Sequence, residues 1–320
     1  MSNSCKCPEP RDPTWKDSDI FVIITGANRG IGLGLSQFAM KEFTNPDLNI
    51  KNLNFMFIVR DTEKLNKTIE NVSTFKNPEF TGSVGFVKDN SCVIDLLTSS
   101  DEQFEKAILS LKKLEGETKR KSFYFLFHNA ASLGEVKTPN GSPIKMQSQV
   151  DYLRINYASM TSLTWMFLKV LPCRVERQLQ NFIIVNFTSL WGIVASTHVS
   201  QYCSMKAARE MFIKCLAVDQ TDICSMNFSP GPVETDMWTN LSRDNGSSEA
   251  KELCAEMEKT GRVKKPDDSI RVLFKWLRKL AFHEGVIEHN KNICSLHEKE
   301  AIDFSRGSHF STEMDENMSH

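Results

Sequence analysis

Residues 20–32 read IFVIITGANRGIG, an apolar run that ends in a glycine-rich loop. Gly26, Gly30 and Gly32 follow the pattern G-x-x-x-G-x-G, and residues 31–43 continue as a helical stretch. Glycines between a strand and a helix let the backbone approach a pyrophosphate, whose charge then lies at the N-terminus of the helix. A lone glycine motif also fits a merely tight turn. The strand before it and the helix after it favour a nucleotide site.

Further short apolar runs alternate along the chain with longer stretches of helical period. Near-continuous apolar strands separated by helices imply a parallel sheet that is covered on both faces. The expected strands are 20–25, 53–59, 83–95 (interrupted), 122–128, 181–187, 223–229 and, more weakly, GVIEH at 285–289. Helical faces are expected at Phe104, Ala107, Ile108 and Leu111, and at Ile270, Leu273, Phe274 and Leu277. The prediction is an α/β fold, a doubly wound, Rossmann-like parallel sheet of about seven strands with helices on both faces.

The two ends of the chain differ in composition from the part between them. Residues 1–19 are rich in Pro, Ser and charge and predict a flexible lead-in. Residues 20–290 predict a single domain, and residues 291–320 turn polar and predict mostly a loose tail.

The overall charge and the cysteines limit the classes of partner. With 39 Lys+Arg against 40 Asp+Glu, the chain has no basic field for nucleic acid or an anionic membrane. No apolar run approaches the roughly 20 residues that span a bilayer, and the N-terminus lacks the apolar segment of a secretory signal. The nine cysteines are scattered, and Cys5 and Cys7 have no second pair to complete a zinc site. We expect free thiols in a reducing, cytoplasmic environment and no metal site.

Two arginines stand beside the glycine loop. Arg60 follows the second strand in FIVRD, and Arg29 lies within the loop itself. A dinucleotide fold that prefers NAD usually places an acid here for the ribose 2′-hydroxyl, whereas an arginine accommodates a 2′-phosphate. Two guanidiniums at one corner suit a phosphate dianion, so we predict NADPH/NADP+ as the cofactor. Asp61 could serve the ribose, or it could be the N-cap of the next helix.

Tyr202 and Lys206 stand four residues apart in SQYCSMKAA, on one face of the helix that follows the fifth strand. Ser189 lies at the end of that strand. In an open parallel sheet the ligand crevice lies beyond the carboxyl ends of the strands. The strand and the returning helix are therefore expected to bring all three groups to one crevice.

These residue types suit the reduction of a carbonyl by hydride, because the alkoxide that forms must receive a proton. A free tyrosine has a pKa of about 10 and is a slow proton donor or acceptor at neutral pH. A nearby lysine cation is expected to lower the pKa of Tyr202, and the Ser189 hydroxyl to hold the polarised oxygen. An ordinary surface helix would explain Tyr202 and Lys206 by themselves. The glycine loop and Ser189 together favour the catalytic interpretation.

With these motifs the chain resembles the short-chain dehydrogenases/reductases. TGANRGIG, the N-A of HNAA (128–131), Ser189, YCSMK (202–206) and SPGPVETD (229–236) match that family's motifs in order and spacing over about residues 20–290. The resemblance implies catalytic roles for Ser189, Tyr202, Lys206 and Asn156. Asn156 would bend its helix and hold a water that connects the lysine to solvent.

The same resemblance implies a set of cofactor contacts. Asp95 and Leu96 would flank the adenine, Asn129 and Ala130 would shape the cofactor floor, and the segment after the sixth strand would contact the nicotinamide end. The implied cofactor-binding residues are Gly26, Asn28, Arg29, Gly30, Ile31, Gly32, Arg60, Asp95, Leu96, Asn129, Ala130, Tyr202, Lys206, Pro230, Gly231, Val233 and Thr235.

A closer similarity is to the family's pterin-reducing members. It is carried by HNAASLGEVK, VNFTSLWG, YCSMKAAREM and FSPGPVETDM, and by the pairing of Arg29 with Arg60. It implies NADPH-dependent reduction of pterin side-chain ketones in tetrahydrobiopterin biosynthesis, by a cytoplasmic homodimer. The helices around 146–171 and 199–218 would form the dimer interface. Core packing within one chain explains their apolar stripes equally well: Val150, Leu153, Met160, Leu163, Val199, Met211, Phe212 and Cys215.

The chain departs from the family pattern at three places. Ala131 stands where glycine is usual, which could crowd the nicotinamide ribose. His128 replaces the usual asparagine, and we interpret it as a hydrogen-bonded structural histidine rather than a proton donor. Pterin-reducing members carry a C-terminal aspartate that anchors the pterin. Aligned on Gly285, that position falls at His289, with Glu288 beside it as a substitute or as a solvent-facing strand residue.

Residues 238–266 lie between the sixth strand and the last helix, where they predict either a substrate lid or plain surface helix. Met237 and Trp238 could line a flat pocket or simply be buried. Ser189, Tyr202, Glu288 and His289 are the predicted substrate contacts. Two other functions stay open: reduction of a non-pterin ketone such as a steroid, quinone or dicarbonyl, and a non-catalytic NADP(H)-binding regulatory protein.

Overall fold

A parallel sheet with the strand order β3-β2-β1-β4-β5-β6-β9 forms the centre of the protein. The computed structural model describes residues 15–115, 120–136, 143–171, 180–220, 223–244, 248–279, 282–283, 286–287 and 309–311. Six strands form the body of the sheet, and the three-residue β9 extends it as a seventh. The strands are β1 (Asp19–Thr25), β2 (Asn52–Ile58), β3 (Ser83–Phe86), β4 (Ser122–His128), β5 (Gln180–Phe187), β6 (Cys224–Ser229) and β9 (His309–Ser311).

The order of the strands places a switch point between β1 and β4. The chain moves outward from β1 through β2 to β3, and then crosses to β4 and continues in the other direction to β6. Ile23 of β1 pairs with Met56 of β2 on one side and with Leu126 of β4 on the other. Helices leave in opposite directions at such a point, so a crevice opens beyond the carboxyl ends of the strands. The predicted doubly wound fold is confirmed.

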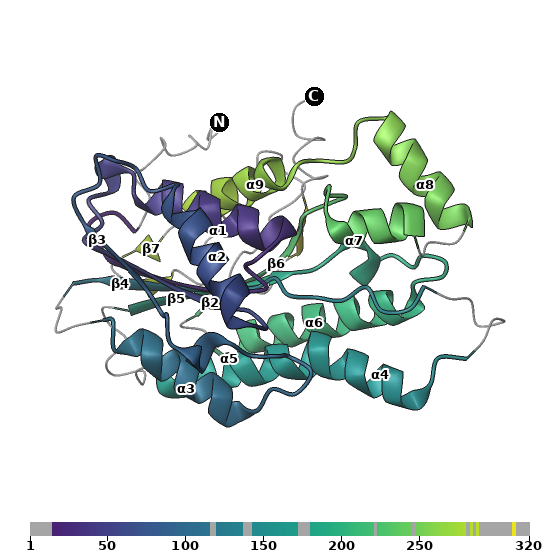
Figure 1. Ribbon diagram of the computed structural model, residues 1–320, viewed down its shortest axis with the longest axis horizontal. Helices are drawn as coiled ribbons and strands as arrows, with labels where there is room; N and C mark the ends of the chain where they lie inside the picture. Colours follow the sequence, from purple (N-terminus) through teal and green to yellow (C-terminus); the bar gives the residue numbers. More distant parts are fainter. Residues whose placement is uncertain are drawn as a thin grey trace, which may run out of the picture.

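Helices cover both faces of the sheet, with α1, α2 and α9 on one side and α3, α5 and α6 on the other (Figure 1). The predicted apolar faces of α3 and α9 are fully buried against it. α7 and α8 lie together at one end of the sheet (Figure 1). The helices are α1 (Gly30–Phe43), α2 (Thr62–Ser73), α3 (Asp101–Lys112), α4 (Met146–Leu153), α5 (Ser159–Val170), α6 (Ser200–Asp219), α7 (Asp236–Thr239), α8 (Ser248–Lys259) and α9 (Pro266–Lys279).

The lead-in ends earlier than the composition predicted. Trp15 is fully buried, with its ring centroid 5.9 Å from that of Phe43 and 5.8 Å from that of Phe125. Ser18 is also buried, and β1 begins at Asp19. A buried tryptophan removes a large apolar area from water, which outweighs the polar character of its neighbours. The ordered chain therefore includes residues 15–19.

The weak strand predicted at 285–289 contains β8 (Val286–Ile287), but β8 does not join the main sheet. β7 (Phe282–His283) and β8 pair antiparallel in a separate two-stranded ribbon. Two residues ending in glycine separate these short runs, a spacing typical of a hairpin. The place beside β6 is taken by β9, which lies within the segment expected to be a loose tail. No helix in the described ranges is both long and apolar enough to cross a membrane.

Candidate active site

The glycine loop forms a close cradle at the carboxyl end of β1. Gly26 and Gly30 adopt positive φ angles of 68° and 53°, a region that glycine enters without strain. A Cβ at Gly32 would lie 2.2 Å from the Gly26 carbonyl oxygen, so only glycine fits there. The Asn129 amide donates to the carbonyl oxygen of Thr25 at 2.9 Å and thereby fixes the start of the loop. The backbone is arranged as a pyrophosphate at the N-terminus of α1 requires.

The charged residues beside the cradle divide between two roles. The Asp61 side chain accepts a hydrogen bond from the Lys64 backbone N–H at 2.8 Å and caps α2, which confirms the capping interpretation. Arg60 is exposed at the end of β2. Arg29 lies at the N-cap of α1, where Nη1 forms an ion pair with Asp236 Oδ2 at 2.7 Å. A 2′-phosphate contact with Arg29 remains a prediction and requires this pair to open.

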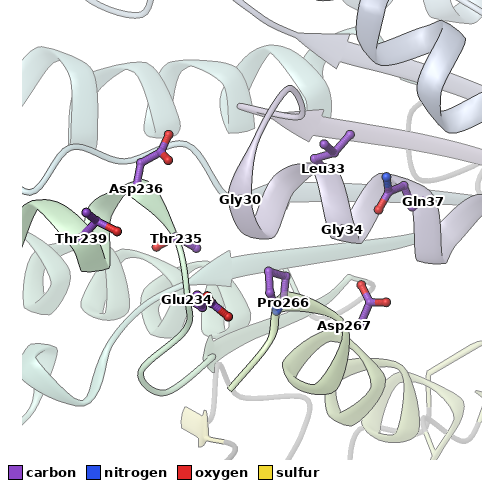
Figure 2. A pocket seen from close by; sticks show the side chains of 10 residues that line it. All are labelled: Gly30, Leu33, Gly34, Gln37, Glu234, Thr235, Asp236, Thr239, Pro266 and Asp267. Atoms are coloured by element: carbon purple, nitrogen blue, oxygen red, sulfur yellow. The ribbon is translucent and has the colours of Figure 1, made fainter. Parts of the chain in front are cut away.

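A cavity of about 470 Å³ borders the glycine loop at Gly30 (Figure 2). It lies between α1, the segment that leads into α7, and the start of α9. The carboxyl groups of Glu234, Asp236 and Asp267 belong to its lining, which is unfavourable for an anion. The lining does not include Ser189, Tyr202 or Lys206. The cavity therefore adjoins the predicted cofactor residues Gly30 and Thr235 but not the predicted catalytic residues.

The other predicted cofactor residues gather along the carboxyl edge of the sheet. The Ala130 N–H donates to the Thr25 hydroxyl at 2.9 Å, so the turn after β4 is tied to β1. Gly231 has a φ of 71°, and the methyl group of Thr235 lies 3.3 Å from where a Cβ of Gly30 would stand. Asp95 is exposed, and Asn28, Ile31 and Leu96 are half-buried, whereas Pro230 and Val233 are buried. Contacts of these residues with a cofactor remain predictions.

Ser189, Tyr202 and Lys206 come together at the end of β5, as predicted. The Ser189 hydroxyl hydrogen-bonds to the Tyr202 phenol. Lys206 Nζ lies 5.4 Å from the centroid of the Tyr202 ring and donates to the Phe187 carbonyl oxygen at 2.7 Å. Both Tyr202 and Lys206 are buried, with 8% and 5% of their surface exposed. A proton donor, a hydrogen-bond partner and an amine thus share one enclosed place.

The titration of Tyr202 differs from the sequence-based expectation. Burial raises the pKa of Tyr202 to about 12, while the hydrogen bond to Ser189 and the charge of Arg209 act to lower it. Burial and the charge of Arg209 hold the pKa of Lys206 well below its ordinary value. The expected lowering of the pKa of Tyr202 by Lys206 is therefore not found in the protein alone, because desolvation disfavours charge on both groups.

Asn156 is placed by a distortion in its helix. Residues Arg154–Ala158 form a π-helical turn between α4 and α5. The Asn156 amide donates to the Tyr152 carbonyl oxygen at 3.0 Å, and its Oδ1 accepts from the Ser132 N–H at 2.7 Å. Single π turns inside helices are frequent at functional sites. The distortion agrees with a bent helix at Asn156, and the water that it would hold remains a prediction.

A buried polar network lies beneath the site, and the sequence analysis missed its central residue. His128 is 1% exposed, its Nε2 lies 2.8 Å from the Thr164 hydroxyl, and burial lowers its pKa well below the usual range. The structural interpretation of His128 is confirmed. Its carbonyl oxygen accepts a hydrogen bond from Arg209, which is also buried. Arg209 follows Tyr202 by seven residues, a helical spacing that could have revealed it.

An apolar cluster covers Tyr202 from the other side. The Trp191 ring meets the Tyr202 ring edge-on, with centroids 6.1 Å apart. Met237 and Trp238 are partly buried against the same cluster. Trp238 Nε1 donates to Glu258 Oε1 at 2.9 Å and so connects α7 with α8. The fully buried members of the cluster are Leu133, Val199, Tyr202, Leu241, Ala250 and Cys254.

Of the four residues predicted to contact a substrate, Ser189 and Tyr202 lie side by side at the end of β5. Glu288 and His289 lie outside the described residues. β9 ends at Ser311, which pairs with Ser229 at the carboxyl end of β6. A role for Glu288 and His289 in anchoring a substrate remains a prediction.

Comparison with known proteins agrees with this geometry. The model of the family described as short chain dehydrogenase matches residues 21–246. The chain belongs to the short-chain dehydrogenase family and is an oxidoreductase by membership.

Among individual relatives, the chain is similar to sepiapterin reductases. It is 25% identical to that of Xenopus tropicalis over 266 residues, which cover 83% of this chain and 94% of the relative. It is 23% identical to that of Mus musculus, over 82% of this chain and 93% of the relative. L-sorbose reductase from Gluconobacter frateurii, solved with NADPH and L-sorbose, shares the fold with a TM-score of 0.62 at 18% identity, over 93% of this chain and 96% of that structure.

Proposed function

We propose that this protein is an NADPH-dependent carbonyl reductase that acts on the side-chain ketone of a pterin. The single observation that carries the proposal is the enclosed group of Ser189, Tyr202 and Lys206 beside a glycine cradle. The similarity to sepiapterin reductases supports the pterin, and the capping role of Asp61 supports NADPH over NADH. Pterin reduction would place the protein in tetrahydrobiopterin biosynthesis.

The residues of the chain divide the work of the proposed reaction. When bound, NADPH supplies a hydride to the carbonyl carbon of the ketone. Ser189 orients the carbonyl oxygen, and Tyr202 gives its phenolic proton to that oxygen, so the ketone becomes an alcohol. Lys206 and Asn156 return a proton to Tyr202 from solvent. Gly26, Gly30 and Gly32, with Arg29 and Arg60, would hold the phosphates of the cofactor, and Lys206 its nicotinamide ribose.

The surroundings of Tyr202 support a flat substrate. Trp191 meets the Tyr202 ring edge-on, Met237 and Trp238 pack against the same cluster, and aromatic walls favour planar rings. Ala250 and Cys254 of α8 belong to the same cluster as Tyr202, which supports a lid role for the segment 238–266. A quinone or another flat, non-pterin ketone fits the same wall, and this is the second candidate. The two candidates differ in hydrogen bonding, because a pterin has a pyrimidine ring that the protein can hydrogen-bond and a quinone has no such ring.

We also propose a homodimer through α4, α5 and α6. Of the predicted stripes, Met160, Leu163 and Val199 are buried in the core of one chain. Val150 and Leu153 are 40% and 47% exposed. The other large apolar side chains exposed on these helices are Met146, Trp165, Met211 and Val218. A second copy that covers them would remove this apolar surface from water.

NADPH oxidation by the purified protein tests the proposed function. Sepiapterin, a quinone and a steroid ketone are offered in parallel to the wild type, to Tyr202→Phe and to Tyr157→Phe. Tyr157 is the matched control, since its ring packs edge-on against Phe212 rather than at the site. We expect turnover of sepiapterin that Tyr202→Phe abolishes and Tyr157→Phe preserves. Turnover of the quinone alone would select the second candidate, and NADPH binding without any turnover would support a regulatory protein.

A further inference from the structure

Arg209 shares the inner face of α6 with the catalytic pair. It follows Tyr202 by seven residues and Lys206 by three, so the three side chains lie on one side of the helix. Their exposed fractions are 8%, 5% and 1% in chain order. A buried arginine on the catalytic face needs a physical explanation, because arginine is almost never fully buried unless it is paired.

The guanidinium of Arg209 is held by three neutral acceptors. Nη2 donates to the His128 carbonyl oxygen at 2.7 Å, and Nη1 donates to the Ala130 carbonyl oxygen at 3.1 Å. Nε donates to Asn186 Oδ1 at 2.8 Å. The first acceptor belongs to the last residue of β4, the second belongs to the turn after it, which is the expected floor of the cofactor site, and the third belongs to β5. Arg209 therefore connects α6, the cofactor floor and the strand that carries Ser189.

None of these three acceptors of Arg209 is a carboxylate. Glu210, the adjacent acid, accepts a hydrogen bond from the Thr188 hydroxyl at 2.8 Å, and its other oxygen lies 3.9 Å from Lys214 Nζ. The remaining titratable groups around the phenol of Tyr202 are Tyr152 on α4, His128 on β4, Cys203 and Lys206 on α6, and Cys254 on α8. The charge of Glu210 acts on Lys206, whose pKa it raises, whereas the charge of Arg209 lowers the pKa of both Lys206 and Tyr202.

We propose that Arg209 is a positioning residue and the permanent cation of the active site. It holds the cofactor floor against α6, and its charge favours negative charge on the Tyr202 oxygen. Preorganised charge aimed at a developing anion is an effective device in a site that excludes water. A guanidinium keeps its proton under all conditions in which the protein is folded, whereas a buried amine readily loses it.

The electrostatics of the site agree with this division of roles. The charge of Arg209 lowers the pKa of Tyr202, against the larger effect of burial. Burial and the charge of Arg209 lower the pKa of Lys206 well below its ordinary value, against the opposite effect of Glu210. The pKa of Arg209 is lowered only to about 10, which leaves it charged at neutral pH.

Two substitutions remove the net charge in different ways. Arg209→Gln keeps a hydrogen-bond donor and removes the cation. Asn186→Asp leaves Arg209 in place and gives it a carboxylate partner at the position where Nε now donates to an amide. Thermal melting and NADPH titration establish that each variant is folded and binds the cofactor. Arg209→Gln changes α6 and Asn186→Asp changes β5, so if one variant fails to fold the other still tests the proposal.

The measurement is the pH dependence of kcat/KM for oxidation of the alcohol product with NADP+, in which Tyr202 acts as the base. We expect the midpoint of the rise to move to higher pH by about one unit in both variants, since an opposite charge nearby typically shifts a pKa by 1–3 units. A rate that falls by one factor at every pH, with the midpoint unmoved in the folded variants, would overturn the proposal. That result would make Arg209 a purely structural clamp.

The inference rests on the proposed function, so a second readout separates the two. The tyrosinate absorbance of the NADP+ complex is measured against pH for the wild type and for Tyr202→Phe, and the difference between the two curves gives the titration of Tyr202. The same difference is measured between Arg209→Gln and the double variant that also carries Tyr202→Phe. If no ketone is reduced, the proposed function fails, yet this titration still tests Arg209. A Tyr202 midpoint that is the same in both backgrounds contradicts the inference whatever the substrate is.

Discussion

Replacing Gly32 with alanine tests whether the loop after β1 is the phosphate cradle. The new Cβ would lie 2.2 Å from the Gly26 carbonyl oxygen and 2.5 Å from Asn129 Nδ2. A carbon and a carbonyl oxygen normally stay about 3.3 Å apart, so the loop must move by about 1 Å. It cannot yield freely, because the Gly26 N–H donates to the Ile58 carbonyl oxygen at 2.9 Å.

The expected effect of Gly32→Ala on binding is much larger than its effect on stability. Overpacking costs about 1–3 kcal/mol, and replacing a helical glycine returns up to about 1 kcal/mol, so the net loss of unfolding free energy is about 0–2 kcal/mol. In a protein of this size that lowers Tm by at most about 8 °C. A misplacement of about 1 Å at a functional site can cost about 100-fold, and we expect the Kd for NADPH to rise by that factor.

Gly261→Ala is the matched control. Gly261 has a φ of 68°, and no atom lies within 4 Å of a Cβ built there. Alanine in this left-handed conformation costs about 1–2 kcal/mol, which is comparable to the loss at Gly32. Fluorescence titration with NADPH and thermal melting are run on both variants. Similar melting with a selective loss of affinity in Gly32→Ala is expected. Unchanged affinity in Gly32→Ala would refute the assignment of the cradle.

Three further perturbations test other parts of the structure. Asp236→Asn releases Arg29 from an ion pair whose side chains are 65% and 75% exposed, so Tm should stay nearly constant. Titrations should show that NADPH binds a few-fold more tightly and that the affinity for NADH is unchanged. Weaker binding of NADPH would contradict this expectation. Burial lowers the pKa of His128, so the folded state takes up fewer protons than the unfolded chain, and stability should fall as the pH drops below about 6.5. In His128→Gln the new side chain can still hydrogen-bond to Thr164, and the loss of stability at low pH should become smaller. Urea unfolding at a series of pH values measures this loss, and an identical loss in the variant would exclude His128 as its source. The side chain of Met211 is 59% exposed, and Met211→Glu should convert the proposed dimer to a monomer without lowering Tm. Light scattering measures the mass, and an unchanged mass would exclude Met211 from the interface.

The part of the fold that could be predicted rests on strong apolar signals. β1, β4 and β5 are near-continuous apolar runs, and such runs separated by amphipathic helices have few alternatives to a doubly wound sheet. Trp15 lacked this signal, because one aromatic residue in a polar stretch has no periodicity. β9 also lacked it. His309–Ser311 joins the sheet through backbone pairing with Asn227–Ser229, which requires no apolar pattern.

The part of the site that could be predicted consists of groups whose spacing follows from a single element. Tyr202 and Lys206 share a helix turn, and Ser189 ends the strand before that helix. Arg209 was missed for a different reason, since arginine is ordinarily a surface residue and its acceptors come from other elements. Two of those three acceptors are backbone carbonyl oxygens, which carry no signature in the sequence.

The environments of the two arginines indicate why they suit different tasks. Arg29 is exposed and paired with a carboxylate in water, where the pair contributes about 0–1 kcal/mol and can be exchanged for a phosphate with little loss. Arg209 is 1% exposed and held by three acceptors, so its charge can neither move away nor be screened by solvent. An exchangeable charge is suited to the recognition of a ligand that enters and leaves. A fixed charge is suited to an anion that forms at one atom during the reaction, and among the residues described here Tyr202 is the group on which that charge would develop.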